Sequence, residues 1–221
     1  MIRVRVLAMA IALLALLGAS GRAGAQDEGD PRLRTRLDAR TAASVQATVD
    51  AARADGLPTE PLVLKALEGA SKGAQSVRIV AAVSRLHSQL GLARTAIGSG
   101  STEAEIIAAT GALQAGVAAE TLEQLRAARP FAPLTTALTV LSDLIGRGVP
   151  APTASQTVLA LVRAGTPDGQ LAVYGQVVER DVRAGSVPAG AAAGAPGVPP
   201  AGIPVSPGTP PAKGGGRPPI Q

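Results

Sequence analysis

Residues 74–97 read AQSVRIVAAVSRLHSQLGLARTAI, and the spacing of their apolar side chains decides the fold class. Ile79, Val83, Leu86 and Leu90 follow one another at steps of four, three and four, which places them on one face of an α-helix. The same spacing recurs in Leu134, Leu138, Leu141 and Ile145, and again in Leu171, Tyr174, Val178 and Val182. No sustained period-two alternation interrupts these stripes. The sequence therefore predicts an all-α domain over residues 32–184.

Glycine and proline divide this domain into about eight short helices. We expect the first three over residues 31–54, 60–72 and 74–97, and a fourth that Thr102 and Glu105 open as a capping box. A fifth follows Gly116, and a sixth starts at Pro130 and Pro133. A seventh is capped by Thr153, and the eighth follows Pro167. Eight helices in so few residues are typical of bundles and of arrays of helical hairpins.

A short turn sequence recurs before three of the expected helices. It reads GLPT at residues 56–59, GVAA at 116–119 and GVPA at 148–151. The last two copies start 32 residues apart and the first lies 60 residues before the second, spacings close to one and two helical-hairpin units. Chance similarity in a chain rich in Ala, Gly and Pro explains the pattern equally well, so the repeat is one of two open interpretations.

The first 25 residues have the three parts of a secretory signal peptide. Arg3 and Arg5 precede an apolar run of 12 residues at positions 6–17, and Ala23-Gly24-Ala25 has the small residues of a cleavage site. An uncleaved membrane anchor is the alternative, but a spanning helix needs about 20 apolar residues. We therefore expect cleavage near Ala25, a short linker at residues 26–31, and a mature protein in the periplasm or the extracellular space.

Residues 185–221 differ in composition from the predicted helices. They contain 10 Pro and 9 Gly, no acidic residue, and only Lys213 and Arg217 as charges. Such a segment buries too little apolar surface to offset the entropy of ordering, so we predict a disordered tail. It could serve as a spacer, as a ligand for a proline-binding groove, or as a solubilising extension.

Charge and composition exclude several kinds of site. The chain has no cysteine, which excludes disulfides, thiolate metal ligands and cysteine nucleophiles. Removal of the signal peptide, with Arg3, Arg5 and Arg22, leaves 18 basic and 16 acidic residues, a net charge of +2. These charges alternate along the helices and no aromatic residues are interspersed among them, so we expect no nucleic-acid binding.

No group of residues predicts catalysis, cofactor binding or metal binding. His87 is the only histidine and lies at the edge of an apolar stripe, as a boundary residue does. Glu103 with Glu105, and Glu120 with Glu123, lie near helix starts, where acidic side chains favour the helix dipole. The sequence at residues 69–73, GASKG, lacks the spacing of a phosphate-binding loop and is typical of a helix end.

Three functions remain compatible with these features. The first is an exported, non-catalytic helical interaction or scaffold module of the bacterial cell envelope, whose partner is a protein or an envelope polymer. The second is a hydrolase of an envelope polymer that uses carboxylates, because carboxylates alone can perform acid and base catalysis. The third is a structural or stress-protective envelope protein.

Overall fold

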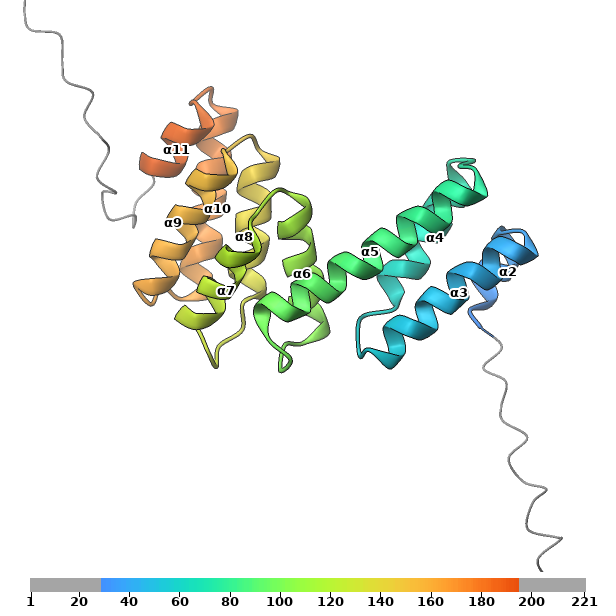
Figure 1. Cartoon of the computed structure of the whole chain (residues 1–221). Helices are drawn as coiled ribbons and strands as arrows, with labels where there is room; N and C mark the ends of the chain where they lie inside the picture. The colour runs from blue at the N-terminus through green and yellow to red at the C-terminus, as the bar shows by residue number, and fades with distance from the viewer. Residues whose placement is uncertain (1–28, 195–221) are drawn as a thin grey trace, which may run out of the picture. The chain divides into compact units, whose positions relative to one another are not determined.

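The computed structural model describes residues 29–194, and every regular element in that range is an α-helix (Figure 1). The expected signal peptide, residues 26–28 of the expected linker, and residues 195–221 of the expected tail lie outside the described residues. The chain divides into two compact units, with the boundary between Gly91 and Leu92. None of the helices in residues 29–194 has the length and apolar content that a bilayer crossing requires.

Ten helices form over the described residues, two more than the sequence predicted. Those that start in the first unit are α2 (Pro31–Arg36), α3 (Ala39–Ala54), α4 (Glu60–Ser71) and α5 (Ser76–Ile97), and α5 continues past Gly91. The second unit contains α6 (Glu103–Gln114), α7 (Ala119–Ala128), α8 (Thr135–Gly146), α9 (Ala151–Arg163), α10 (Asp168–Arg183) and α11 (Pro188–Gly194).

The first additional helix arises because Asp38 interrupts the helix expected over residues 31–54. Its carboxylate accepts hydrogen bonds from the Thr41 N–H at 3.0 Å, the Thr41 hydroxyl at 2.6 Å and the Ser76 hydroxyl at 2.9 Å. The Thr41 hydroxyl contributes most to holding the pKa of Asp38 at about 2. An aspartate that caps in this way favours a new helix start over continuation of the old one, so α3 begins at Ala39.

The second additional helix, α11, lies in the segment that the sequence assigned to the disordered tail. Ala191 and Ala192 are buried, and the Tyr174 hydroxyl of α10 donates a hydrogen bond to the Ala192 carbonyl oxygen at 2.8 Å. Alanines let a short helix approach its neighbours closely, and Pro188 is tolerated as a first helical residue. The helical part of the chain therefore extends beyond residue 184, to Gly194 at the end of the described residues.

Two helix starts also differ from their predicted positions. Pro130 and Pro133 precede α8 but lie outside it, because α8 begins at Thr135. Thr153 does not cap α9, which begins at Ala151 without a side-chain cap. Local sequence indicated the connection in both cases but left its boundary open by a few residues.

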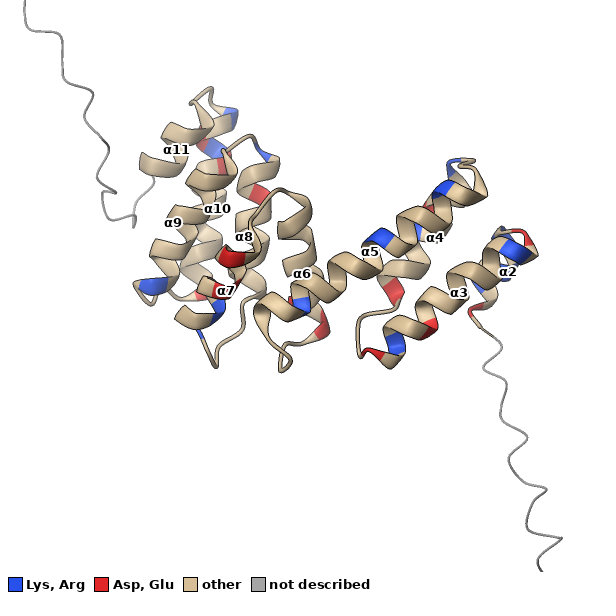
Figure 2. Cartoon of the chain, in the orientation of Figure 1, with Lys and Arg blue, Asp and Glu red and all other residues tan. Residues whose placement is uncertain are grey.

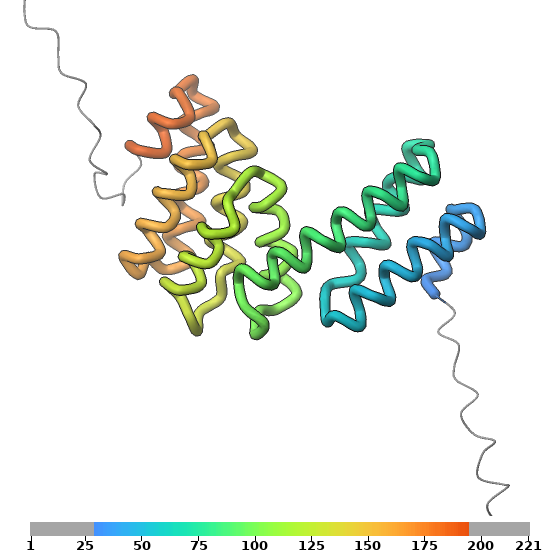
Figure 3. The backbone as a smooth tube through the Cα atoms, in the orientation of Figure 1, coloured from blue at the N-terminus to red at the C-terminus, as the bar shows by residue number. Residues whose placement is uncertain are grey.

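Alternate helices of the second unit pack against one another. Helix α6 packs on α8 and α8 on α10, while α7 packs on α9 and α9 on α11 (Figure 3). The leucines of the predicted stripe, Leu134 just before α8 and Leu138 and Leu141 within it, have no exposed surface. A core of Leu, Val and Ala supports this packing because small side chains let helix axes approach.

The first unit also depends on close helix packing. Helix α2 packs on α3 and α4, and α3 packs on α4. Ile79, Val83 and Leu90 of the predicted stripe are buried, and Leu86 is partly exposed. A Cβ on Gly69 of α4 would lie 2.9 Å from Ile79 Cγ1, so glycine is required for this contact.

The recurring turn sequence has one conformation in all three copies. Gly56, Gly116 and Gly148 have φ of 65°, 98° and 92°, and the N–H of each following residue donates to the carbonyl five residues before it. Those following residues, Leu57, Val117 and Val149, are buried. Gly165, which ends α9, has φ of 75° and the same hydrogen-bond pattern. The turn therefore marks helix ends in general, as a glycine cap does.

We predict that Gly116→Ala destabilises the protein while Gly91→Ala does not. Alanine at φ of 98° is expected to cost about 1–2 kcal/mol. In contrast, Gly91 lies inside α5 where a Cβ meets no other atom within 4 Å, so alanine there is expected to add about 0.5–1 kcal/mol. Urea unfolding followed by circular dichroism measures both changes. Equal effects of the two substitutions would contradict the assigned role of Gly116.

Candidate functional site

The candidate site is built around the buried carboxylate of Glu105, in the first turn of α6. Glu105 Oε2 accepts a hydrogen bond from the Thr102 N–H at 2.9 Å, and the Thr102 hydroxyl accepts one from the Glu105 N–H at 3.3 Å. This reciprocal pair is the capping box that the sequence predicted, and it is confirmed. The burial of Glu105, which is 5% exposed, was not predicted.

The second oxygen of Glu105 binds two segments that follow α6 in the chain. Its Oε1 accepts hydrogen bonds from Arg126 at 2.6 Å and from the Leu134 N–H at 3.0 Å. Burial alone raises the pKa of Glu105. The hydrogen bonds from Thr102, Leu134 and Arg126, together with the guanidinium charge, outweigh burial and hold the pKa of Glu105 below its ordinary value.

Arg126 of α7 fixes the segment between α7 and α8. Its Nη1 donates to the carbonyl oxygens of Arg129 and Ala132, both at 3.2 Å, and its Nε donates to the Ile97 carbonyl at 3.0 Å. One side chain therefore joins the end of α5, the start of α6 and the α7–α8 connection. We call residues 129–134 the clamped loop.

Arg129 fixes the other side of the clamped loop. Its guanidinium pairs with the Asp168 carboxylate and donates to the Thr166 carbonyl oxygen, in the connection between α9 and α10. The Arg129 side chain is 11% exposed and that of Asp168 is 41% exposed, so solvent partly screens this ion pair. The two arginines thus bind the clamped loop to the helix connections on both sides of it.

The clamped loop presents the only phenylalanine of the protein. Phe131 lies between Pro130 and Pro133 and is 99% exposed. A fully exposed ring contributes no hydrophobic free energy to folding. A loop that two arginines hold loses little conformational entropy when it binds a partner. The two prolines predict only a helix boundary, and Phe131 was not predicted as a site residue. A lone aromatic residue between prolines, in a chain nearly free of aromatics, was the available signal.

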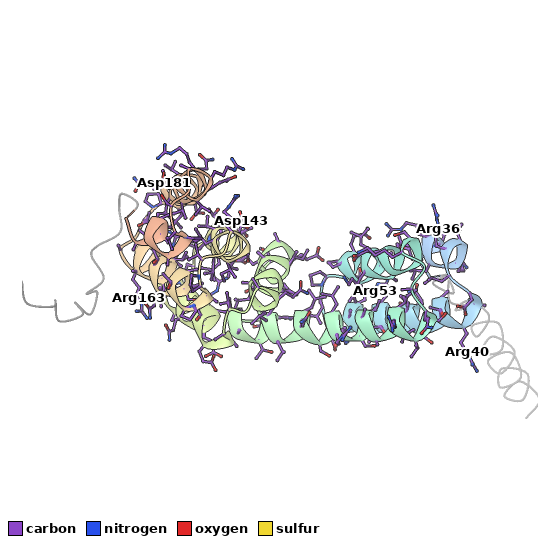
Figure 4. All side chains as sticks on the ribbon, turned by 90° about the horizontal axis from the view of Figure 1, so that it is seen from above. Arg36, Arg40, Arg53, Asp143, Arg163 and Asp181 are labelled. Atoms are coloured by element: carbon purple, nitrogen blue, oxygen red, sulfur yellow. The ribbon has the colours of Figure 1, made fainter. Side chains whose placement is uncertain are left out.

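A groove of about 410 Å³ between α8 and α10 is the second feature of this unit. Asp143 and Glu179 line it, so it brings two carboxylates to one groove. Glu179 pairs with Arg147 at 2.7 Å and also with Arg183, and Asp143 is exposed (Figure 4). The groove therefore holds one exposed carboxylate and one that is engaged in two ion pairs.

The remaining residues that the sequence singled out lie apart from the clamped loop. His87 Nε2 is 3.5 Å from Asp55 Oδ2, in the first unit. Glu103, Glu120 and Glu123 are exposed on α6 and α7. Lys72, in the segment that superficially resembles a phosphate loop, follows α4 and pairs with Glu68. Over residues 29–194, no three His, Asp or Glu side chains gather as a metal site would require.

Comparison with known proteins gave no family model, curated protein or solved structure that matches this chain.

We predict that Arg126→Met destabilises the second unit strongly. Methionine keeps the apolar stem but leaves the buried Glu105 carboxylate without its cation, and removing one partner of a buried pair costs about 3–5 kcal/mol. Arg163→Met is the control, because Arg163 is exposed and its hydrogen bond to Gln124 is long, at 3.5 Å. That control is expected to change stability by less than about 0.5 kcal/mol in urea unfolding. Equal losses would show that Arg126 is not a clamp.

Acid sensitivity provides a second prediction for Glu105. Its pKa is lower in the folded protein than in the unfolded chain, so its stabilisation is present above the unfolded pKa, about 4.3. That stabilisation is lost as the pH falls through the folded pKa. Glu105→Gln is therefore expected to be less stable at pH 7 and to lose less stability than the unchanged protein between pH 5 and pH 3. Parallel pH profiles from urea unfolding would contradict this.

Proposed function

We propose that this chain is an exported, non-catalytic interaction or scaffold module of the bacterial cell envelope. The signal-type sequence of residues 1–25 supports export, and the composition of the residues after Gly194 suits a spacer. The alternate packing of α6 to α11 supports an array of helical hairpins, an architecture that commonly presents binding surfaces. The step from architecture to function is an analogy, so the proposal depends on a particular surface.

The exposure of Phe131 on the clamped loop is the observation that carries the proposal. Aromatic side chains dominate the binding energy of protein interfaces, because they bury a large area with few rotatable bonds. Here the loop backbone is already fixed by Arg126 and Arg129, so binding at Phe131 requires little ordering. The buried Glu105 carboxylate holds Arg126, and Arg126 holds the loop that carries Phe131. This arrangement favours recognition over catalysis.

A carboxylate-dependent hydrolase is the alternative that one observation favours, namely the groove with Asp143 and Glu179. The ion pairs of Glu179 with Arg147 and Arg183 argue against it. Both ion pairs engage the Glu179 carboxylate oxygens within the chain itself, so these oxygens are not free to meet a substrate. The interaction module is therefore the better supported function.

Affinity capture with three baits tests the proposed function. The baits are the mature chain from Gln26 to Gln221, the same chain with Phe131→Ala, and the same chain with Leu92→Ala. Leu92 is 60% exposed on α5 and serves as the matched apolar control. Removal of either exposed side chain is expected to leave stability within about 0.5 kcal/mol, so all baits should fold.

We expect a binding partner from the organism's own solubilised envelope to be retained by the mature chain and by Leu92→Ala, and to be lost with Phe131→Ala. Mass spectrometry of the protein recovered from the organism is expected to show Gln26 as its first residue. A partner retained by all three baits would move binding away from the clamped loop. An intact signal segment, or no partner in any capture, would count against the proposal.

A further inference from the structure

We propose that the proline-rich segment of residues 207–213, PGTPPAK, docks into the groove between α8 and α10 of its own chain. Lys213 pairs with Asp143 there, and Pro210 and Pro211 lie along the threonines of α8. The sequence alone leaves open whether this part of the chain is a spacer, a ligand for a proline-binding groove or a solubilising extension. Docking makes it a ligand, places its groove on the same chain, and requires nothing of the clamped loop.

Asp143 is the one charged side chain of the groove that has no partner among the described residues. It is exposed, and α8 contains no other charged residue (Figure 2). No group of residues 29–194 bonds to its carboxylate. Glu179, on the α10 wall, is already bound by Arg147 and Arg183. A ligand that matches the groove therefore carries a positive charge.

The groove also has neutral polar side chains whose hydrogen bonds are unused. Four of its lining residues carry a hydroxyl or an amide, namely Thr135, Thr136, Thr139 and Gln176. None of these groups has a hydrogen-bond partner among the described residues. Thr139 could donate to the carbonyl oxygen four residues before it, as Thr110 and Ser142 do, and it does not. These donors are therefore available to a ligand.

The composition of residues 195–212 matches those donors. Seven of the 18 residues are proline, which has a carbonyl oxygen but no N–H. Backbone acceptors therefore outnumber backbone donors, and a partner has to supply donors, as hydroxyl and amide groups do. Lys213 and Arg217 are the only charged side chains after Gly194, and both are positive. The segment thus carries the sign of charge that Asp143 attracts.

The chain is long enough for this contact. Helix α11 ends at Gly194 and packs on α10, which forms one wall of the groove. An α-helix with its side chains is about 10–12 Å wide. The 18 residues between Gly194 and Lys213 span up to about 56 Å in polyproline II geometry, at about 3.1 Å per residue. The segment can therefore pass around α10, and the contact lies within one unit.

Three other hollows lack the carboxylate that Lys213 needs. One of about 600 Å³ in the first unit is lined by Arg32 and Arg36, which repel a basic segment. The hollow beside α2 and α3 contains Asp30, but Arg32 already binds that carboxylate. The hollow between α7 and α9 has no charged lining residue. Charge therefore selects the groove between α8 and α10.

Tethering allows a weak contact to be populated. An exposed ion pair contributes little by itself. Attachment to the same chain, however, gives the segment an effective concentration in the millimolar range, so a contact with a Kd of about 1 mM is occupied in a large fraction of molecules. Docking covers the groove and shortens the reach of the residues after Gly194, and release reverses both effects.

Paramagnetic NMR of the mature chain tests the proposal. The absence of cysteine allows a single nitroxide label at Ser206→Cys, just before the docking segment. We expect the label to broaden the methyl signal of Thr139, in the groove, much more than that of Thr121, in the hollow between α7 and α9. The same chain with the nitroxide reduced is the reference. Broadening of Thr139 that is absent, or no stronger than that of Thr121, would overturn the proposal.

Charge reversal in the labelled chain tests the ion pair itself. Asp143→Lys is expected to lower the ratio of docked to free segment at least about threefold, because it replaces an attraction with a repulsion. Glu123→Lys is the matched control, since it makes the same charge change at an exposed position outside the groove. That control should leave the broadening of Thr139 unchanged.

Lys213→Asp is likewise expected to release the segment, and its combination with Asp143→Lys is expected to restore docking. Both positions are outside the core, so circular dichroism should show the same helix content in every variant. Broadening of Thr139 that survives Asp143→Lys, or that the double variant does not restore, would contradict the assigned pair.

This contact and the proposed function can fail separately. A segment that never reaches the groove overturns the docking and leaves capture through Phe131 in place. Docking without any captured partner overturns the interaction module and leaves the intramolecular contact in place.

Discussion

The second unit depends on the buried carboxylate of Glu105, which must stay fully hydrogen-bonded. A buried charge without partners costs several kcal/mol. The groups that donate hydrogen bonds to the two oxygens of Glu105 must therefore stay within reach of them. Those groups belong to the start of α6, to Arg126 of α7 and to the backbone of Leu134 before α8. One carboxylate therefore fixes the positions of three consecutive helices relative to the clamped loop.

The composition of the core makes the exposure of Phe131 unusual. Leu, Val and Ala fill the interior, and the chain has only two large rings, Tyr174 and Phe131. Tyr174 is buried, donates to the Ala192 carbonyl, and has a pKa raised to about 12 by that burial. Phe131 is exposed although burial of a phenyl ring is strongly favourable. The loop that Arg126 and Arg129 hold in place accounts for this exposure.

Local interactions explain why much of the helical structure could be predicted. The capping box of Thr102 and Glu105 spans three residues, and the stripe of leucines on α8 follows from helical geometry alone. The errors were also local in origin. An aspartate inside a helical pattern does not by itself mark a helix start, so Asp38 was not predicted as a cap. The segment around residue 191 is poor in large apolar residues, a composition that predicts a tail and not a helix.

The fold class and the turn glycines follow from the sequence alone, because helix periodicity and chain reversal depend on neighbours within a few residues. The signal-like segment also follows from the sequence, as a pattern of composition. The clamped loop, in contrast, depends on contacts between residues that are distant in the chain. Arg126 lies 21 residues from Glu105, and Arg129 lies 39 residues from Asp168. Those partners meet through the packing of whole helices, so no local pattern could show that Glu105 would be buried or that Phe131 would face solvent.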